Sequence, residues 1–469
     1  MDPDNLCLHS LTLDPNQLNF RLQVVTWNVG TAPPPRDLSS LLLLDSSGSD
    51  IDMYIIGLQE VNSKIINFLS DLAFDDPWSL FLMDILAPHG YIKLSSIRMQ
   101  GLLLLTFIKH KHIPFIQDIR TNYIRTGLYG YWGNKGGVTL RMSVYGHMLC
   151  FMNCHLPAHM ENTDQRLDDF ERMLEAQQFD GESVGSILDH DLVFWFGDLN
   201  FRISDFGIHF IREVVNSNRY NLLWEKDQLN MAKKKERFLQ GFVEGPLKFK
   251  PTYKFDLNSD VYDTSGKKRK PAWTDRILWK LKEISPNEYE DSIGSDFEHI
   301  LKVNLDKYTS HMSYGISDHK PVTGTFTLQM KPLILEPSVT LRAEGEWNAD
   351  RDSLISYSVS KDFPSSTWDW IGVYRVGFRH ANDYVTYAWV KDDEISFSKD
   401  CNQVYISADE IPLDGGEFLL CYFCHNLQFL AGISDPFQIQ PGRTLPAKDG
   451  IQEKNDESAK SDMFMGAGF

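Results

Sequence analysis

Long apolar segments are absent from the sequence. A transmembrane helix needs about 20 consecutive, mostly apolar residues, and no stretch of the 469 residues approaches that length. The acidic start MDPDNLCLHS also lacks the basic and apolar regions of a signal peptide. We therefore expect a soluble protein that stays in the cytosol.

Cysteine is scarce, and the six cysteines show no spacing typical of a disulfide framework. Cys421 and Cys424 form a CxxC pair within FLLCYFCHN, a segment typical of a strand. Residues three apart on a strand point to opposite faces of the sheet. This pair is therefore a poor candidate for a metal or redox site.

Positive charge is in deficit, since 46 Lys and Arg against 64 Asp and Glu give a net charge of −18. Proteins that hold nucleic acid non-specifically usually carry a basic surface, so this balance argues against a nucleic-acid polymer as ligand. One segment differs, because LKFKPTYKFD followed by SGKKRK is rich in cations. We expect two to four of them to bind phosphates of a small ligand and the rest to be solvated. The cluster comprises Lys248, Lys250, Lys254, Lys267, Lys268, Arg269 and Lys270.

The length and a 42% hydrophobic content predict two domains, each with its own core. Strand-like and helix-like segments interleave up to about residue 328, which indicates a layered α/β domain. One helix is predicted in TDQRLDDFERMLEAQQF, with Thr163 or Asp164 as N-cap. From about residue 338, short β-like segments follow one another and predict a sandwich of about a hundred residues. The polar segment 443–469 is predicted to be disordered.

Polar motifs follow or precede several of the predicted strands. Taken singly, each Asp or His would more often be a turn former, a helix cap or a structural histidine. Strand ends on one edge of a sheet converge, however, and together these groups suit a magnesium-dependent phosphate hydrolase. The motifs are TWNVG, LQE, NCHLPAH, GDLNFR, PAWTDRIL and SDHKPV.

Oxygen ligands for Mg²⁺ are expected at two strand ends. Glu60 is the main candidate, with the Asn28 amide beside it, because a carboxylate and a carboxamide provide the hard oxygen ligation that magnesium prefers. Asp318 of SDHKPV is a further candidate ligand.

The remaining motifs predict the groups that act on phosphate. Asp198 and Asn200 lie at i and i+2, so that one can accept a proton from water while the other orients the phosphate. Asp275 is placed to accept a hydrogen bond from His319, which fixes the tautomer and favours the cationic imidazole. His155 would offer a second donor to the transferred phosphoryl group.

These motifs, with GNKGG and PTYKFD, resemble the inositol polyphosphate 5-phosphatase family within the endonuclease, exonuclease and phosphatase superfamily. The resemblance spans residues 16–328 and implies a four-layered α/β sandwich. It implies magnesium-dependent hydrolysis of the 5-phosphate of PtdIns(4,5)P2 and PtdIns(3,4,5)P3, and also of soluble inositol polyphosphates, by in-line attack of water. It assigns Asp198, Asp275, His319, His155 and Asn200 to catalysis.

The resemblance also implies a set of substrate contacts around the catalytic groups. The 4-phosphate next to the scissile group would be bound by part of the basic cluster, and this sequence departs from many relatives in its additional Lys268 and Lys270 and in Gly30 of TWNVG. The implied substrate-binding residues are Lys135, His159, Arg202, Tyr253, Lys254, Lys267 and Arg269.

The C-terminal segments DWIGVYRVG, YVTYAWV and SDPFQI, within residues 338–442, resemble the SKICH domain, an immunoglobulin-like β-sandwich. The resemblance implies a protein partner and recruitment to membranes, at the endoplasmic reticulum surface or at plasma membrane ruffles. None of its residues has a catalytic pattern. We expect a monomer.

The segment GLYGYWGNKGG has two open interpretations. Its large side chains suit contact with a lipid interface beside the active site, and they could equally cover the core of the domain. The segment contains Leu128, Tyr129, Tyr131 and Trp132. Lys135 in the same segment could bind a phosphate or be a solvated loop lysine.

Two other functions are open on this evidence. A nuclease of the same superfamily is disfavoured by the acidic composition and the lysine-rich PTYKFD segment. A catalytically silent adaptor is disfavoured by intact Asp198, Asp275 and His319. Phosphate release from PtdIns(4,5)P2 with and without magnesium separates the three.

Overall fold

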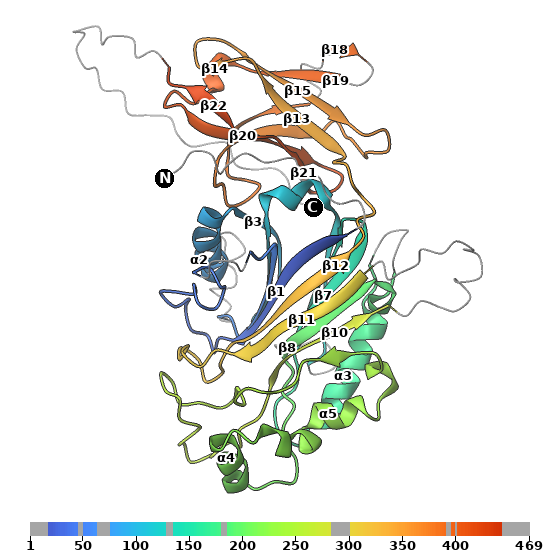
Figure 1. The fold of residues 1–469 in the computed structure, drawn as a ribbon, viewed down its shortest axis with the longest axis vertical. Coiled ribbons are helices and arrows are strands. Elements are labelled where there is room, and N and C mark those ends of the chain that lie inside the picture. The colour runs from blue at the N-terminus through green and yellow to red at the C-terminus, as the bar shows by residue number, and fades with distance from the viewer. Residues whose placement is uncertain are drawn as a thin grey trace, which may run out of the picture.

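The computed structural model shows two layered units stacked along the long axis of the molecule (Figure 1). The loop with Leu128 and Trp132 and the predicted tail 443–469 lie outside the described residues. The structure describes residues 17–45, 50–62, 76–127, 135–179, 185–282, 301–390, 395–398 and 401–442. Among these, no helix is long and apolar enough to cross a membrane.

The first unit contains two six-stranded sheets of mixed direction. Their orders are β11-β12-β1-β2-β4-β3 and β5-β6-β7-β8-β10-β9. The pairs β1/β2 and β7/β8 are parallel, and the other pairs are antiparallel. The strands are β1 (Leu18–Asn28), β2 (Met53–Gln59), β3 (Tyr91–Met99), β4 (Leu102–Lys109), β5 (Ile116–Arg125), β6 (Gly136–Val144), β7 (His147–His155), β8 (Leu192–Asp198), β9 (Val243–Glu244), β10 (Asp275–Leu281), β11 (Leu301–Ser310) and β12 (Val322–Met330).

Helices cover the outer faces of the two sheets. Leu22 of β1 and Phe194 of β8 lie in the core between the sheets. Leu82 of α2 (Pro77–Leu86) packs on the outer side of the first sheet, and Phe170 of α3 (Thr163–Ala176) stacks on Trp195 outside the second. The predicted four-layered α/β sandwich is therefore confirmed. Two shorter helices, α4 (Ile208–Asn216) and α5 (Gln228–Lys233), follow β8.

The start of α3 differs from the prediction. The N-cap residue is Asn162, and neither Thr163 nor Asp164 takes that position. The Asn162 carbonyl accepts the first helical hydrogen bond, from Arg166 N at 3.0 Å, so Thr163 is already within the helix. The sequence offers three capping residues in a row, and propensity alone does not choose among them.

The second unit is a β-sandwich, as predicted. One sheet has the order β13-β15-β19-β18, and the other has β14-β22-β20-β16-β17 with β21 also paired to β20. The domain limits 16–328 and 338–442 stay a prediction. The strands are β13 (Val339–Glu344), β14 (Trp347–Asn348), β15 (Ser353–Val359), β16 (Trp370–Arg375), β17 (Tyr384–Trp389), β18 (Ile395–Ser398), β19 (Cys401–Ile406), β20 (Gly416–Cys424), β21 (Phe429–Ile433) and β22 (Phe437–Gln440).

The two units meet at a largely apolar junction. The short helix η3 (His110–Phe115) lies against β21, and the ring of His110 stacks on Phe378 with 4.8 Å between centroids. Lys93 N donates to Arg379 O at 2.9 Å, and Arg379 forms an ion pair with Asp84 at 2.7 Å. β4 runs antiparallel to β2, so η3 lies near the start of β2. The junction is therefore remote from the end of β2.

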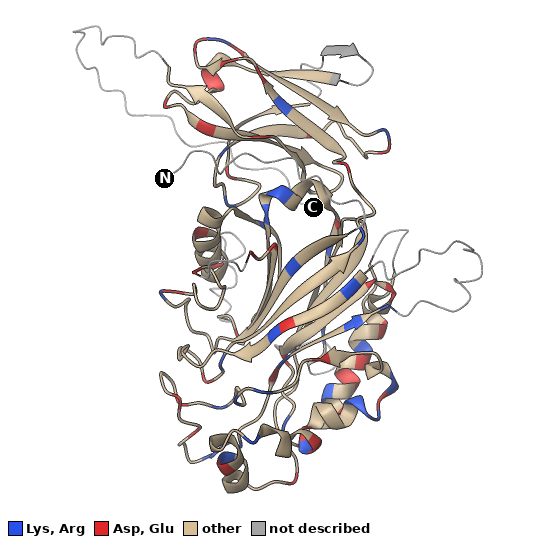
Figure 2. Ribbon diagram, in the orientation of Figure 1, with Lys and Arg blue, Asp and Glu red and all other residues tan. Residues whose placement is uncertain are grey.

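Charged residues lie mainly on helices and loops, and the strands are mostly uncharged (Figure 2). This distribution makes any charged group buried at a strand end conspicuous, because ionised groups are rarely buried without a partner.

Candidate active site

Strand register brings three of the predicted groups side by side. The parallel pairing of β7 and β8 places His155 opposite Asp198, and the antiparallel pairing of β8 and β10 places Asp275 opposite Asp198. Gly197 permits the approach, because its φ is +139° and a Cβ there would lie 2.0 Å from Cys154 O. Asn28 ends β1 next to β2, so the predicted convergence of strand ends is present.

Asp198 is the central group of this cluster. Its Oδ2 accepts a hydrogen bond from Asn28 Nδ2 at 3.0 Å and lies 3.3 Å from His155 Nε2 and 3.9 Å from His319 Nε2. Although burial opposes its ionisation, the charges of His319, His155 and Lys135 hold the pKa of Asp198 well below its usual range. The side chain is therefore an ionised carboxylate surrounded by donors.

The predicted hydrogen bond between Asp275 and His319 is present. His319 Nδ1 lies 2.9 Å from Asp275 Oδ2, which leaves Nε2 facing Asp198. Burial disfavours the imidazolium, but Asp275 and Asp198 outweigh it and raise the pKa of His319 to about 9. The hydroxyls of Thr252 and Thr274 donate to Asp275 at 2.6 and 2.9 Å. These threonines were not predicted as site residues, although both lie inside the motifs PTYKFD and PAWTDRIL.

Lys135 lies inside the cluster. Its Nζ is within hydrogen-bonding distance of His155 Nε2, and burial lowers the Lys135 pKa to about 8 against the opposing charges of Asp198 and Glu60. Burial and the Lys135 charge also lower the pKa of His155. The interpretation of Lys135 as a solvated loop lysine is therefore wrong.

The same groups form a candidate metal centre. Asn28 Nδ2 donates to Glu60 Oε1 at 3.1 Å as well as to Asp198. Asp198, Asp275 and His319 each offer a ligand atom within 4.8 Å of the others. Asp275 Oδ1 is buried and accepts no hydrogen bond from the described residues, and such an orphan carboxylate oxygen fits a hard divalent cation.

Asp318, the third predicted metal ligand, has a different partner. Its Oδ2 lies 2.6 Å from Lys254 Nζ, and this carboxylate raises the pKa of Lys254 against the effect of burial. The pair lies beside the cluster, next to His319 in the chain.

Three residues around the centre adopt a left-handed backbone that side chains usually avoid. Glu60 has φ +54°, Asn200 has φ +58° and His159 has φ +76°. Such conformations cost free energy and persist where the surrounding structure determines them, as at functional sites.

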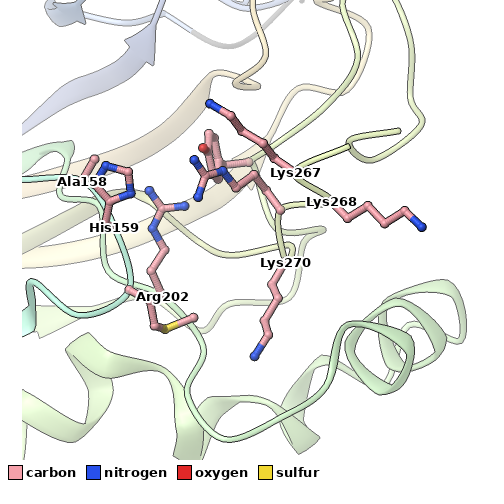
Figure 3. A pocket seen from close by; sticks show the side chains of 9 residues that line it. Ala158, His159, Arg202, Lys267, Lys268 and Lys270 are labelled. Carbon is pink, nitrogen blue, oxygen red and sulfur yellow. The ribbon is translucent and has the colours of Figure 1, made fainter. Parts of the chain in front are cut away.

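A basic pocket adjoins the cluster. The ring of Tyr253 lies 4.6 Å from the ring of His319 and 4.4 Å below the Arg202 guanidinium, so Tyr253 connects the reaction centre to the pocket. Figure 3 shows the side chains of His159 and Arg202 turned toward one another, whereas Lys268 and Lys270 extend away. The pocket is lined by Ala158, His159, Met160, Arg202, Tyr253, Lys267, Lys268, Arg269 and Lys270.

Of the predicted basic cluster, the segment 267–270 lines this pocket, and Lys248, Lys250 and Lys254 do not. Lys254 instead pairs with Asp318.

Ser317 and Trp27 position the His319 loop and were not singled out from the sequence. Ser317 Oγ donates to Asn28 O at 2.6 Å and accepts from His319 N at 3.2 Å. Trp27 Nε1 donates to His319 O at 3.1 Å. These bonds join the loop to the end of β1. Both residues lie inside predicted motifs, Ser317 in SDHKPV and Trp27 in TWNVG, and this position in the motifs could have identified them.

Residues 25–325 match the Endonuclease/Exonuclease/phosphatase family 2, and residues 339–439 match the SKICH domain. Inositol polyphosphate 5-phosphatase K of Mus musculus is 53% identical over 94% of this chain and 93% of the relative. Phosphatidylinositol 4,5-bisphosphate 5-phosphatase A of Homo sapiens is 50% identical over 94% of this chain, which spans only 43% of that relative.

A solved structure, the inositol polyphosphate 5-phosphatase domain of SPsynaptojanin in complex with inositol (1,4)-bisphosphate and a calcium ion, has a TM-score of 0.57 and 30% identity. The similarity covers 67% of this chain and 85% of that one. The resemblance inferred from the motifs is confirmed. The chain belongs to the inositol polyphosphate 5-phosphatases of the endonuclease/exonuclease/phosphatase family and carries a C-terminal SKICH domain.

Proposed function

We propose that the protein is a magnesium-dependent phosphoinositide 5-phosphatase that hydrolyses the 5-phosphate of PtdIns(4,5)P2 and PtdIns(3,4,5)P3 and of soluble inositol polyphosphates. The observation that carries this proposal is the position of Tyr253, between His319 at the buried carboxylate–imidazole centre and Arg202 of the basic pocket. A substrate with two neighbouring phosphates fits this arrangement, with one phosphate at the centre and the other at the cations.

Asp198 is the group that receives the proton of the attacking water. Its low pKa makes it a weak base, but phosphoryl transfer passes through a loose transition state in which orienting the nucleophile matters more than strong deprotonation. Asn28 and His155 fix the carboxylate, and Asn200 N donates to Asp198 Oδ1 at 3.2 Å. The water is thereby held in line with the scissile bond.

Imidazoles and a lysine stabilise the phosphoryl oxygens. His319, cationic near neutral pH and oriented by Asp275, donates from Nε2. His155 and Lys135 approach from the other side of Asp198. These donors are fixed before the substrate arrives, so little reorganisation is needed when charge develops.

Magnesium would be held by Glu60 and Asn28, with a carboxylate of Asp198 or Asp275 completing the protein ligands. When bound, it supplies charge neutralisation for the phosphate and the leaving oxygen.

The neighbouring 4-phosphate is assigned to Tyr253, Lys267 and Arg269, with His159 and Arg202 at the opposite wall. Lys254 would join them only if its ion pair with Asp318 opened. The additional Lys268 and Lys270 point outward and would meet the anionic surface around a lipid headgroup.

The proposal also includes a cytosolic monomer recruited to the endoplasmic reticulum surface or to plasma membrane ruffles. The proposed membrane contact through Leu128, Tyr129, Tyr131 and Trp132 predicts that Leu128→Ala with Trp132→Ala reduces turnover on vesicles. Unchanged turnover on vesicles would remove that contact.

Phosphate release from PtdIns(4,5)P2 vesicles and from inositol 1,4,5-trisphosphate tests the activity, with magnesium and with EDTA. We expect release that requires the metal and vanishes in Asp198→Ala. Cleavage of single-stranded DNA without phosphate release would indicate the nuclease. Absence of both activities in the wild-type protein would favour the interpretation as a catalytically silent adaptor.

A further inference from the structure

The outer face of the SKICH sheet β20-β16-β17 is covered over only part of its area. Tyr374, Leu419 and Cys421 are buried in the apolar cluster that also holds the core between the catalytic sheets. Further along the same face, Trp370 and Phe423 pack against this cluster but are only partly buried. The face therefore continues from the domain junction to solvent.

Six aromatic side chains lie on the part of this face that the catalytic domain leaves open, and we call them the aromatic surface. Trp370 lies 4.9 Å from Phe423, 5.2 Å from Tyr384 and 5.7 Å from Tyr387, measured between ring centroids. Soluble monomers seldom leave contiguous aromatic patches open to water unless they bind something. The surface comprises Trp368, Trp370, Tyr384, Tyr387, Trp389 and Phe423.

Exposure on this surface is high for side chains of this size. Trp368 is 62% exposed, Tyr384 38% and Tyr387 36%. Aromatic residues are enriched where proteins bind other proteins, because a large rigid side chain gains contact area at small entropic cost.

Strand β17 ends the sheet order, and within the described ranges it pairs only with β16. Its sequence YVTYAW has neither a charged residue nor proline, two of the usual protections of an edge strand, and a bulge at Val385 is a third that the strand does have. Opposite Val373 and Tyr374 of β16, this bulge in β17 leaves Val385 without a cross-strand partner and 43% exposed, with Tyr384 and Tyr387 on one face. The strand thus offers main-chain groups beside an apolar face.

We propose that β17 binds an extended segment of a protein partner, which joins the sheet as an additional strand and packs apolar side chains on the aromatic surface. Main-chain hydrogen bonds would supply affinity, and side chains at alternate positions would supply specificity. Every second side chain of an added strand would face the aromatic surface, so the matching segment has apolar residues at alternate positions.

Two observations favour a protein over a bilayer as occupant. The aromatic surface is continuous with the interface between the SKICH domain and the catalytic domain, since Trp370 and Phe423 contribute to both. The basic pocket lies near α4, because Arg212 of α4 donates to Asp263 O at 2.9 Å and Asp263 accepts from Arg269 N. In Figure 1, α4 and the SKICH sheets lie at opposite ends of the long axis.

A random decapeptide library displayed on phage and selected on the full chain provides the probe. We expect enriched peptides with apolar residues at alternate positions. Their affinity should fall at least tenfold in Tyr387→Lys and after N-methylation of alternate peptide bonds. Tyr405→Lys is the matched control, because Tyr405 is 37% exposed on β19 of the other sheet. Both variants should retain the melting temperature and the hydrolysis of soluble inositol trisphosphate.

Trp368→Ala serves as a second variant in case Tyr387→Lys does not fold, since the Trp368 side chain is mostly in water. Peptides that bind both Tyr387 and Tyr405 variants as well as wild type would overturn the proposal, as would tolerance of N-methylation. So would a dimer dissolved by Tyr387→Lys, which would make a second copy the occupant. Loss of sedimentation with phosphatidylcholine vesicles in that variant would make it a membrane contact.

Discussion

Asp369 of the SKICH domain and Asp198 of the catalytic domain are both buried among hydrogen-bond donors, and the two carboxylates differ in what those donors are. Asp369 of the SKICH domain accepts from Ser366 N at 2.9 Å, Tyr422 Oη at 2.8 Å and His425 N at 2.8 Å. These donors are two main-chain N–H groups and one tyrosine hydroxyl, and all three are neutral. Asp198 instead faces imidazoles and a lysine carried by separate strands and loops.

The difference separates a structural carboxylate from a reactive one. Neutral main-chain and hydroxyl donors satisfy Asp369 and fix the loops around it. Titratable partners around Asp198 can exchange protons and hold additional negative charge, which is what a phosphate ester requires. Burial alone therefore does not identify a site, whereas the chemistry of the partners does.

The largest expected effect is on catalysis by Asp198. Asp198→Ala should reduce kcat for inositol 1,4,5-trisphosphate by roughly 10²–10⁴-fold, because water loses its acceptor. Asp205→Ala is the control, since Asp205 lies at the surface, where it pairs with Lys226. A fall of less than tenfold would place the proton acceptor elsewhere.

Asp369 should show the opposite pattern. Asp369→Ala leaves three donors without their acceptor, among them the buried Tyr422 hydroxyl, and should lower the free energy of unfolding by about 3 kcal/mol, with kcat of the folded fraction unchanged. Urea unfolding with a parallel assay measures both. Asp414→Ala, at the exposed pair with Arg375, should cost less than about 1 kcal/mol. Loss of kcat in folded Asp369→Ala would break the distinction between the two carboxylates.

Loss of the pocket cations should change substrate binding more than turnover. Lys267→Ala with Arg269→Ala should raise KM for inositol 1,4,5-trisphosphate about 2- to 30-fold, because each charge pair at a solvent-accessible position contributes roughly 0.2–1 kcal/mol. Lys248→Ala provides the control from the same basic cluster, since Lys248 is exposed and lies outside the pocket lining. An equal effect of all three changes would indicate general electrostatics only.

The smallest effect concerns the domain junction. Burial lowers the pKa of His110 to about 4, below the ordinary 6.5, although a hydrogen bond with the Phe378 backbone opposes the shift, so the unfolded chain takes up the proton first. Stability from this group is complete above pH 6.5 and falls as pH decreases toward 4. The melting temperature should fall by a few degrees more over this range in wild type than in His110→Phe, measured by calorimetry. Identical pH profiles would show that His110 does not titrate in this way.

The apolar segments predicted the buried strands and both sandwiches, because continuous Val, Ile and Leu leave few alternatives to a covered sheet. β3, β5 and β11 were not predicted, since their residues mix polar and apolar types at the edge of a sheet, where packing imposes less on the sequence. The local sequence pattern therefore does not predict strands at such edge positions.

Site residues could be grouped by motif, but their pairings depended on register. Asp275 and His319 are 44 residues apart and were matched by the chemistry of the pair alone. Lys254 was expected at a phosphate and instead pairs with Asp318, while Thr252, Thr274, Ser317 and Lys135 acquire their roles only through three-dimensional contacts. Such contacts follow from tertiary packing, which a linear motif does not encode.

The contacts of Lys93 with Arg379 and of His110 with Phe378 join the SKICH domain to the catalytic domain. A membrane-bound partner of the SKICH domain, as proposed above, would therefore also set the height and tilt of the basic pocket above the membrane. Substrate lipids within that height would be hydrolysed and those beyond it would not, so the size of the anchoring partner would define the patch of membrane that the enzyme depletes.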